Sequence, residues 1–318
     1  MQADTLFIDS LAPDDTHQIH TLHWKNPAQN APVIHICHGM AEYAQRYQPI
    51  AEALVAQGYT VFAHDHRGHG GSIAQEEDQG HYADSEGWHK TKTDILAVHN
   101  HIRSQLGPNT DINLLGHSMG SFIAMHFALE HGSSLKGLVL SGSNLPKPML
   151  MKVARLIAAF ERWRQGNRGK SVLLDKLSFG AFNKAFKPAR TEFDWLSRAP
   201  EEVDSYISDP LCGFMCSNQL WLDFLAGLAN LGQAKTFRAL PNDLPMYLFS
   251  GSLDPVSAST DGINKLAARL SEQGQQSVTH RIYEDGRHEM FNETNRSEVI
   301  NDLLVWLKEK AGNVPEIA

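Results

Sequence analysis

The sequence between residues 32 and 141 alternates between short runs rich in β-branched and aromatic residues and longer amphipathic segments. The short runs are PVIHICHG (32–39), YTVFAHD (59–65), DINLLG (111–116) and LKGLVLSGS (135–143). The longer segments cover 43–58, 86–106 and 121–131. Neighbouring parallel strands need long crossover connections, which are usually helices. The alternation therefore predicts an α/β fold with a mostly parallel sheet and helices on both faces.

The remainder of the chain divides into three parts. The first thirty residues predict two antiparallel edge strands, TLFID and HQIHTLHW. Between 145 and 240 the strand rhythm gives way to helix-like segments rich in aromatic and basic residues and broken by prolines. The strand and helix patterns then return from 244 to 311. We expect a core formed by residues 1–144 and 241–318, with a helical cap inserted at 145–240.

Composition limits the choice of partners and compartment. The net charge of -8 gives no electrostatic reason to expect nucleic-acid binding. The N-terminal residues lack the basic and apolar regions of a secretory signal, so we expect a cytoplasmic protein. Three cysteines, Cys37, Cys212 and Cys216, form no CxxC pair and indicate reduced thiols.

Ser118 lies in the sequence GHSMG, a G-x-S-x-G motif at the junction of a predicted strand and a predicted helix. A sharp turn at this junction lifts the serine Oγ clear of the sheet, and Gly116 and Gly120 allow strand and helix to pack closely. The alternative is a plain structural turn. In this setting the motif predicts that Ser118 is a nucleophile.

A serine hydroxyl needs a base within hydrogen-bond reach and a third group that orients the base. His117 is adjacent to Ser118, but neighbouring side chains on a tight turn point in different directions. On this fold the order along the chain is Ser, then Asp or Glu, then His. Of the histidines after the cap, His280 lies inside a predicted strand, whereas His288 follows that strand on a loop. His288 is therefore the predicted base.

Asp254 follows the predicted strand LPMYLFS directly and is the predicted orienting acid. Asp243 precedes that strand and falls at the opposite edge of the sheet. Asp285 is too close to His288 in sequence, and Asp261 should face solvent on a helix. The alternative for Asp254 is a solvated turn carboxylate.

Acyl transfer also requires hydrogen-bond donors for the developing oxyanion. One donor should be the backbone N–H of Met119, the residue after the nucleophile. The second should come from the loop HGMAEY (38–43), with the N–H of Met40 the best candidate. Gly39 would allow the close backbone approach.

Five stretches occur in a family-specific order: HGMAEYAQRY (38–47), FAHDHRGHGGS (62–72), LLGHSMGS (114–121), GSLDPV (251–256) and HEMFNE (288–293). Together they resemble the α/β-hydrolase superfamily, and within it the monoacylglycerol lipase and lysophospholipase group. The resemblance covers nearly the whole chain except the cap. It implies the α/β-hydrolase fold, the triad Ser118, Asp254 and His288, and the oxyanion donors Met40 and Met119.

The resemblance also implies that Glu42 and Arg46 lie near the pocket for the alcohol part of the substrate. At a spacing of i, i+4 the two residues could instead form a structural ion pair. Both interpretations stay open at this point.

Two rival functions follow from other features. HDHRGHG (64–70) has H-x-H-x-x-H spacing, which resembles the zinc-binding H-x-H-x-D-H run of metallo-β-lactamase-fold hydrolases. Gly68 stands where that run has aspartate, and further ligands are not evident. The competing interpretation is that Asp65, Arg67 and Ser72 brace a loop beside the active site. A non-catalytic binding protein on the same fold is the second rival, since fold alone does not establish function.

The start of the predicted cap, residues 146–170, is strongly basic. Seven basic residues against one acidic residue give a charge of +6: Lys147, Lys152, Arg155, Arg162, Arg164, Arg168 and Lys170 against Glu161. On a helix, one face would carry Met149, Val153, Leu156, Phe160 and Trp163. Such a helix suits an anionic lipid surface, although an apolar stripe more often covers a pocket.

The sequence thus predicts a serine hydrolase that cleaves carboxylic esters, with a monoacylglycerol or lysophospholipid as substrate and no metal or organic cofactor. A general carboxylesterase or an amide or peptide hydrolase is the alternative, because the same triad serves both bonds. We expect a cytoplasmic enzyme with peripheral contact at the inner face of a membrane through the basic cap.

Overall fold

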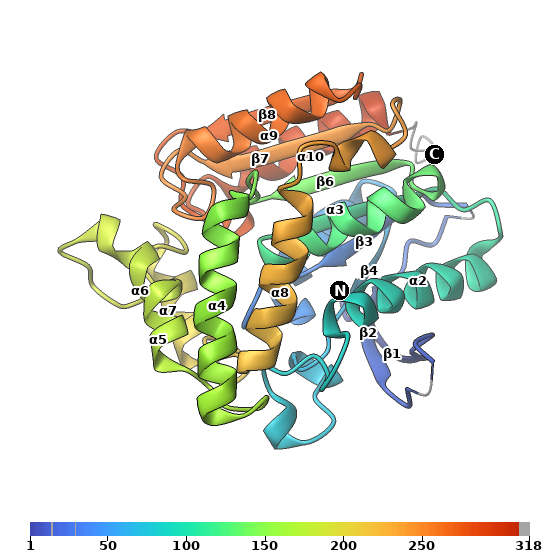
Figure 1. The fold of residues 1–318 in the computed structure, drawn as a ribbon. Helices are drawn as coiled ribbons and strands as arrows, with labels where there is room; N and C mark the ends of the chain where they lie inside the picture. Colours follow the sequence, from blue (N-terminus) through green and yellow to red (C-terminus); the bar gives the residue numbers. More distant parts are fainter. Residues whose placement is uncertain (14, 29, 312–318) are drawn as a thin grey trace.

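An eight-stranded sheet forms the centre of the molecule, in the order β1-β2-β4-β3-β5-β6-β7-β8 (Figure 1). The computed structural model describes residues 1–13, 15–28 and 30–311. The strands are β1 (Asp4–Asp9), β2 (Gln18–Trp24), β3 (Val33–Cys37), β4 (Thr60–His64), β5 (Ile112–His117), β6 (Gly137–Ser141), β7 (Met246–Gly251) and β8 (Val278–Tyr283). β1 and β2 pair antiparallel, as do β2 and β4, and the other pairs are parallel. The predicted mostly parallel α/β sheet is confirmed.

Helices cover both faces of this sheet (Figure 1). One face packs against α1 (Gln48–Ala56) and α10 (Arg296–Lys310). The other packs against α2 (Gly87–Leu106), α3 (Met119–His131) and α9 (Thr260–Glu272). Strands β3 to β7 are buried along their whole length, as expected for parallel strands with helices on both sides.

Some predicted boundaries shift by a turn of helix. The segment predicted as one helix at 43–58 begins as a 3-10 helix, η1 (Ala44–Tyr47), because Pro49 in the first turn of α1 cannot donate a hydrogen bond backwards. Leu106, the last residue of α2, is exposed. The remaining 3-10 turns are η2 (Gly70–Ser72), η3 (Glu76–Asp78), η4 (Gly132–Ser134), η5 (Asn183–Phe186), η6 (Thr236–Ala239) and η7 (Met290–Asn292).

Between β6 and β7 the chain forms helices and no named strand among its described residues. They are α4 (Pro148–Gln165), α5 (Val172–Leu177), α6 (Phe179–Phe182), α7 (Pro200–Ser208) and α8 (Asn218–Leu231). α4 and α8 lie side by side, and α8 also packs on α2 and α3 (Figure 1). None of the helices in the described part of the chain has the length and apolar character needed to cross a bilayer.

Candidate active site

Three loops at the carboxyl edge of the sheet carry the predicted triad. Ser118 follows β5, Asp254 lies three residues beyond the end of β7, and His288 lies five residues beyond the end of β8. Parallel strands end at the same edge, so residues far apart in sequence meet there. This is the edge where ligands bind in open α/β sheets.

Ser118 occupies a strained turn between β5 and α3. Its φ of 50° and ψ of -119° lie in a region that a residue with a side chain rarely adopts. The turn is held by the Ser118 N–H, which donates to the Ser141 carbonyl at 2.9 Å. A Cβ on Gly120 would lie 2.3 Å from the Cys37 carbonyl oxygen, and one on Gly116 would lie 2.4 Å from the Gly120 carbonyl oxygen. Both positions therefore require glycine, which is the geometry of a nucleophile elbow.

His288 and Asp254 form a buried pair beside this turn. His288 Nδ1 lies 2.9 Å from Asp254 Oδ1, and both side chains are almost fully inaccessible. Asp254 also accepts hydrogen bonds from the Val256 N–H at 2.9 Å and the Ser250 hydroxyl at 3.1 Å. The Asp254 carboxylate can only accept a hydrogen bond, so a neutral His288 carries its proton on Nδ1 and donates a hydrogen bond to Asp254. Nε2 then keeps its lone pair.

The charges of this pair oppose the effect of burial. Burial alone would lower the pKa of His288, but the charge and hydrogen bond of Asp254 raise it above its ordinary value. Burial would raise the pKa of Asp254, but the charge of His288 lowers it. His288 is therefore protonated more readily in this pair than an isolated buried histidine would be.

His117 lies beside His288, with ring centroids 4.7 Å apart. Its Nδ1 is 3.1 Å from the Ser141 hydroxyl. Burial, together with the charge of His288, lowers the pKa of His117 to about 4. His117 is thus held as a neutral neighbour of the His288–Asp254 pair.

The loop at 38–43 approaches Ser118 closely, as Gly39 predicted. A Cβ on Gly39 would lie 3.3 Å from the Ser118 Cβ. Met40 follows it, and Ala41 has a positive φ of 55° that turns the chain back. Met119 is the first residue of α3, where a backbone N–H has no partner within the helix. Both predicted oxyanion donors therefore flank the serine in sequence or in space.

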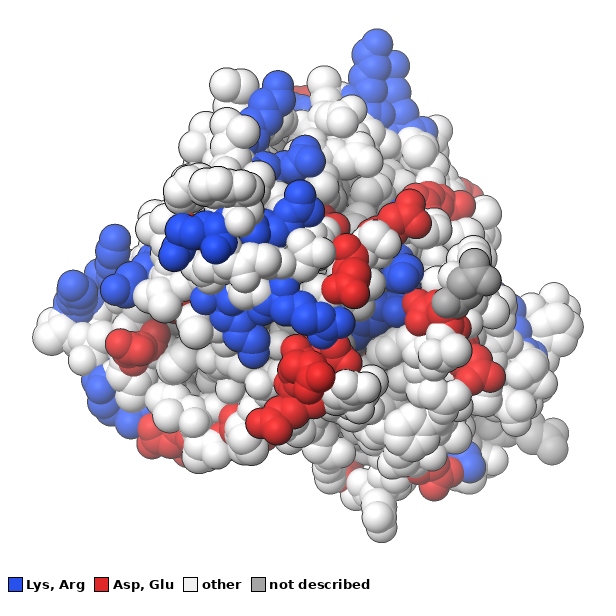
Figure 2. Space-filling view, turned by 60° about the horizontal axis from the view of Figure 1, so that its bottom comes forward, with Lys and Arg blue, Asp and Glu red and all other residues white. Residues whose placement is uncertain are grey.

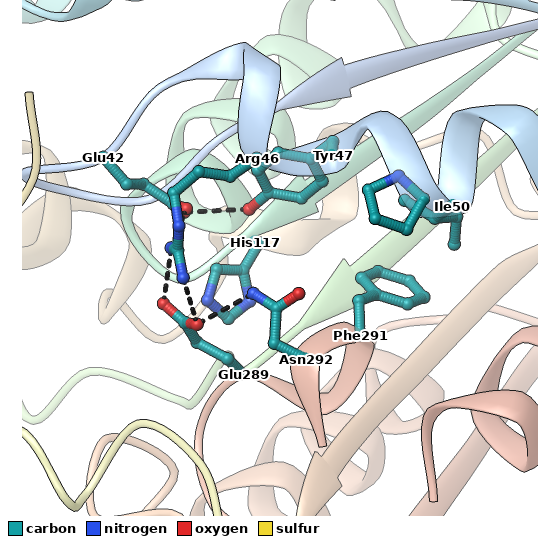
Figure 3. A pocket seen from close by; sticks show the side chains of 9 residues that line it. Glu42, Arg46, Tyr47, Ile50, His117, Glu289, Phe291 and Asn292 are labelled. Carbon is teal, nitrogen blue, oxygen red and sulfur yellow. Dashed lines mark hydrogen bonds and ion pairs between the residues drawn. The ribbon is translucent and has the colours of Figure 1, made fainter. Parts of the chain in front are cut away.

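Glu42 and Arg46 form an ion pair, with Arg46 Nη1 2.6 Å from Glu42 Oε2 (Figure 3). Arg46 also donates to both carboxylate oxygens of Glu289, at 2.7 Å each. A cavity of about 10 Å³, lined in part by His117 and Asn292, lies beside these groups. Sequence reasoning did not select Glu289, although its place directly after His288 could have drawn attention to it.

The segment HDHRGHG forms a hydrogen-bonded loop. The Asp65 carboxylate accepts from the N–H groups of Ala44 and Gly71 at 2.7 Å each, and the Ser72 hydroxyl donates to the Asp65 carbonyl at 2.8 Å. Arg67 donates two hydrogen bonds to the Asp94 carboxylate, at 2.6 and 2.8 Å. These contacts support the interpretation of Asp65, Arg67 and Ser72 as loop braces.

Buried histidines form a chain that begins in this loop. His66 Nδ1 lies 3.1 Å from His64 Nε2, and His64 Nδ1 lies 2.8 Å from His35 Nε2. His35 Nδ1 in turn lies 3.1 Å from His99 Nε2. Within the described residues, the group able to supply three metal ligands at close range is His35, Cys37 and His64, not the three histidines of the H-x-H-x-x-H spacing. Both ring nitrogens of His35 and both ring nitrogens of His64 already lie within hydrogen-bond distance of another imidazole.

The apolar face of α4 points outward. Its side chains are between 52% and 80% exposed, namely those of Met149, Val153, Leu156, Phe160 and Trp163. The opposite face carries the buried Ala158 and Glu161, and packs toward α8. Sequence reasoning gave slight preference to a buried stripe, and that preference was wrong. Figure 2 shows Lys and Arg side chains gathered in one half of a molecular face, with Asp and Glu side chains beside them.

This sheet order, the serine elbow after β5 and the histidine–aspartate pair after β8 and β7 define the α/β-hydrolase class. The same fold occurs in a carboxyl esterase from Bacillus coagulans crystallised with glycerol, with a TM-score of 0.88, 21% identity and coverage of 98% of this chain and 99% of that one. A lipase in its open form has a TM-score of 0.84 at 24% identity, covering 97% and 99% of the two chains.

Sequence comparisons identify the family. The family described as serine aminopeptidase, S33 matches residues 28–295. The mouse monoglyceride lipase is 30% identical over 293 residues, which cover 91% of this chain and 86% of the relative. The monoacylglycerol lipase of Mycolicibacterium smegmatis is 27% identical over 294 residues, 89% of this chain and 90% of the relative. The chain belongs to the S33 family of α/β hydrolases and is an ester hydrolase.

Proposed function

We propose that this enzyme hydrolyses the acyl ester of a monoacylglycerol or a lysophospholipid, with Ser118 as nucleophile, His288 as base and Asp254 as orienting acid. The contact of His288 with Asp254, beside the strained Ser118 turn, is the observation that carries the proposal. The names of the mouse and mycobacterial relatives support a glycerol ester as substrate.

In the proposed reaction, His288 Nε2 takes the Ser118 proton as Oγ attacks the ester carbonyl. The N–H groups of Met40 and Met119 stabilise the oxyanion, a contribution of about 2.7–4 kcal/mol for each donor. His288 then gives its proton to the leaving alcohol, and an acyl-enzyme remains. A water activated by His288 releases the fatty acid. The steps use this chain's side chains and backbone N–H groups together with one water molecule, and the proposal includes no metal or organic cofactor.

We assign substrate access to a cap at residues 145–240, carried by a core of residues 1–144 and 241–318. The hydrogen bonds of the cap residues Trp195 and Leu196 with the backbone of His288 and Glu289 support this division. Glu42 and Arg46 can border the alcohol side of the site, but their ion pair and their contacts with Glu289 favour the structural alternative.

A fluorophosphonate probe tests the nucleophile. The wild type should be labelled and Ser118→Ala should not, whereas Ser133→Ala, which alters an exposed serine, should be labelled normally. A panel of monoacylglycerols, lysophospholipids, short p-nitrophenyl esters and prolyl amides then tests the substrate. Preferred cleavage of the amides would favour the peptidase alternative that the family description suggests. A folded wild type that is not labelled would favour a binding protein.

We also infer that the enzyme works from the cytoplasm at the inner face of a membrane. The outward apolar face of α4 supports this, because exposed contiguous apolar surface marks an interaction site. Lys152 and Arg155 border that face and form no ion pair with the described residues. A peripheral contact of this kind would bring the active site near single-chain lipids.

A further inference from the structure

A buried ionic bridge joins two loops of the active site. Arg46 Nη1 and Nη2 donate to the two carboxylate oxygens of Glu289 at 2.7 Å, and Nη1 also donates to Glu42 Oε2 at 2.6 Å (Figure 3). The three side chains are between 4% and 12% exposed. A two-pronged arginine–carboxylate contact fixes both distance and orientation.

Each end of the bridge holds a different part of the proposed machinery. Glu42 Oε1 accepts the Gly39 N–H at 2.6 Å and the Tyr47 hydroxyl at 2.8 Å, so it fixes the loop that carries Met40. At the other end, Glu289 follows His288 directly, and its backbone N–H donates to the Leu196 carbonyl at 2.8 Å. The bridge therefore sets the distance between the proposed oxyanion loop and the base loop.

The bridge also carries unequal charge, because two carboxylates face one guanidinium. Burial would raise the pKa of Glu289, but the charge of Arg46 lowers it to about 2, which keeps this carboxylate ionised. Glu42 accepts three hydrogen bonds, one of them from the Arg46 guanidinium. Around His288 the other groups are Asp254, the neutral His117 and the ring of Trp195. The excess negative charge of the bridge favours a protonated His288.

We propose that Glu289, acting through Arg46 and Glu42, is a positioning residue that holds the oxyanion loop against the base loop and stabilises the protonated base. This inference rests on the proposed ester hydrolysis. It gives Glu289, the first glutamate of HEMFNE, a role separate from that of His288. It also gives Glu42 and Arg46 a role that does not require contact with the alcohol.

The test is Glu289→Gln, which keeps the shape of the side chain but removes the charge and one acceptor of the arginine contact. We expect kcat to fall about 10²-fold, as for a small misplacement of catalytic groups, with KM within twofold. The acid limb of the kcat/KM profile should move to lower pH, because His288 loses a nearby negative charge. Arg46→Lys, which cannot make the two-pronged contact, should lower kcat in the same direction.

Rates are expressed per active site titrated with the fluorophosphonate, so partial misfolding does not mimic the effect. Glu298→Gln is the matched control, because it breaks an exposed ion pair with Arg281 and should leave kcat and the pH profile unchanged. The inference is wrong if Glu289→Gln and Arg46→Lys keep wild-type kcat and an unshifted acid limb while Ser118→Ala is inactive. Activity in Ser118→Ala would instead overturn the proposed function itself.

Discussion

The indole ring of Trp195 lies against the imidazole of His288, with ring centroids 5.1 Å apart, and the Trp195 carbonyl accepts the His288 backbone N–H at 3.3 Å. Trp195 comes from the segment between α6 and α7, so a residue of the proposed cap covers His288, the proposed base, directly. Both side chains are nearly inaccessible, at 3% and 2% exposure. His288 is thereby shielded from bulk water.

Trp195 should therefore matter for stability as well as for activity. Trp195→Ala removes a large buried ring, and we expect a loss of about 3–5 kcal/mol of unfolding free energy together with lower kcat. Trp195→Phe should lose much less, because the buried indole N–H has no hydrogen-bond partner within residues 1–13, 15–28 and 30–311 to give up. Chemical denaturation and steady-state kinetics measure both. Equal stability of Trp195→Ala and wild type would contradict the packing described here.

Asp254→Asn should change both the size and the pH dependence of activity. The charge of Asp254 raises the pKa of His288, so wild-type kcat/KM is lost as pH falls through a value above the ordinary 6.5. Without that charge the acid limb should move to lower pH, while kcat falls about 10⁴-fold because the orienting carboxylate is lost. Asp261→Asn, on the exposed side of α9, is the control. An unmoved acid limb would argue against this pairing.

Gly120→Ala should destabilise the fold, because its Cβ would overlap the backbone oxygens of Cys37 and His38 at 2.3 and 2.4 Å. Overpacking of this kind costs about 1–3 kcal/mol or more. Gly180→Ala is the matched control, since its Cβ would meet nothing closer than 3.8 Å and should be neutral or slightly stabilising. Thermal unfolding should show a clear drop in the melting temperature of Gly120→Ala and little change in that of Gly180→Ala. Similar melting temperatures for the two variants would count against the elbow geometry.

Stability should fall as the solution is acidified below pH 6.5. Burial lowers the pKa of several histidines, to about 4 for His23 and about 3 for His99, so the unfolded chain binds more protons than the folded one in this range. Each such group adds at most about 1.36 kcal/mol of stability per pH unit as pH rises from its folded pKa to 6.5.

His23→Phe isolates one of these groups. The imidazole of His23 stacks on Phe62 with centroids 3.9 Å apart, and its buried Nε2 has no hydrogen-bond partner in the part of the chain that the structure describes. A phenyl ring fits the same stack without a proton to bind. We expect denaturation curves between pH 4 and 6.5 to show a shallower pH dependence in the variant, and an unchanged slope would refute the assignment.

The outward face of α4 should control binding to anionic vesicles. Leu156→Asp replaces an apolar side chain that would enter the lipid, so affinity should fall about 10- to 100-fold. Binding by the wild type should weaken with added salt, since the basic residues contribute through screened charge. Val305→Asp, an equivalent exposed change on α10, is the control. Hydrolysis of a short soluble ester should be unaffected, and vesicle binding that ignores Leu156→Asp would sink the membrane proposal.

Local patterns predicted most of the fold. The strands carry continuous apolar runs and the helices show a 3.6-residue period, so both elements are visible without tertiary information. The Ser118 motif, Asp254 and His288 could be selected because each follows a predicted strand at the same edge of a parallel sheet. Chain order then removed His117 as a candidate for the base, and its place inside a predicted strand removed His280.

Other features depend on contacts that no local pattern contains. The stripe on α4 was visible in the sequence, but periodicity does not say whether a stripe faces a core or solvent. The contact between Arg46 and Glu289 joins residues 243 positions apart. Trp195 reaches His288 because the chain between α6 and α7 folds back to the carboxyl edge of the sheet, and no local pattern around Trp195 indicates that contact.

The row of imidazoles from His99 through His35 and His64 to His66 has a direction. A neutral imidazole has one N–H, so each ring that accepts a hydrogen bond at one nitrogen donates from the other. All four rings then share one tautomer, Nε2–H if the row donates toward His66 and Nδ1–H if it donates toward His99. The end atoms, His99 Nδ1 and His66 Nε2, are buried and have no hydrogen-bond partner among the described residues, so neither end fixes the direction. The four side chains consequently share two collective tautomeric states, and a change of tautomer in one ring requires the same change in the other three.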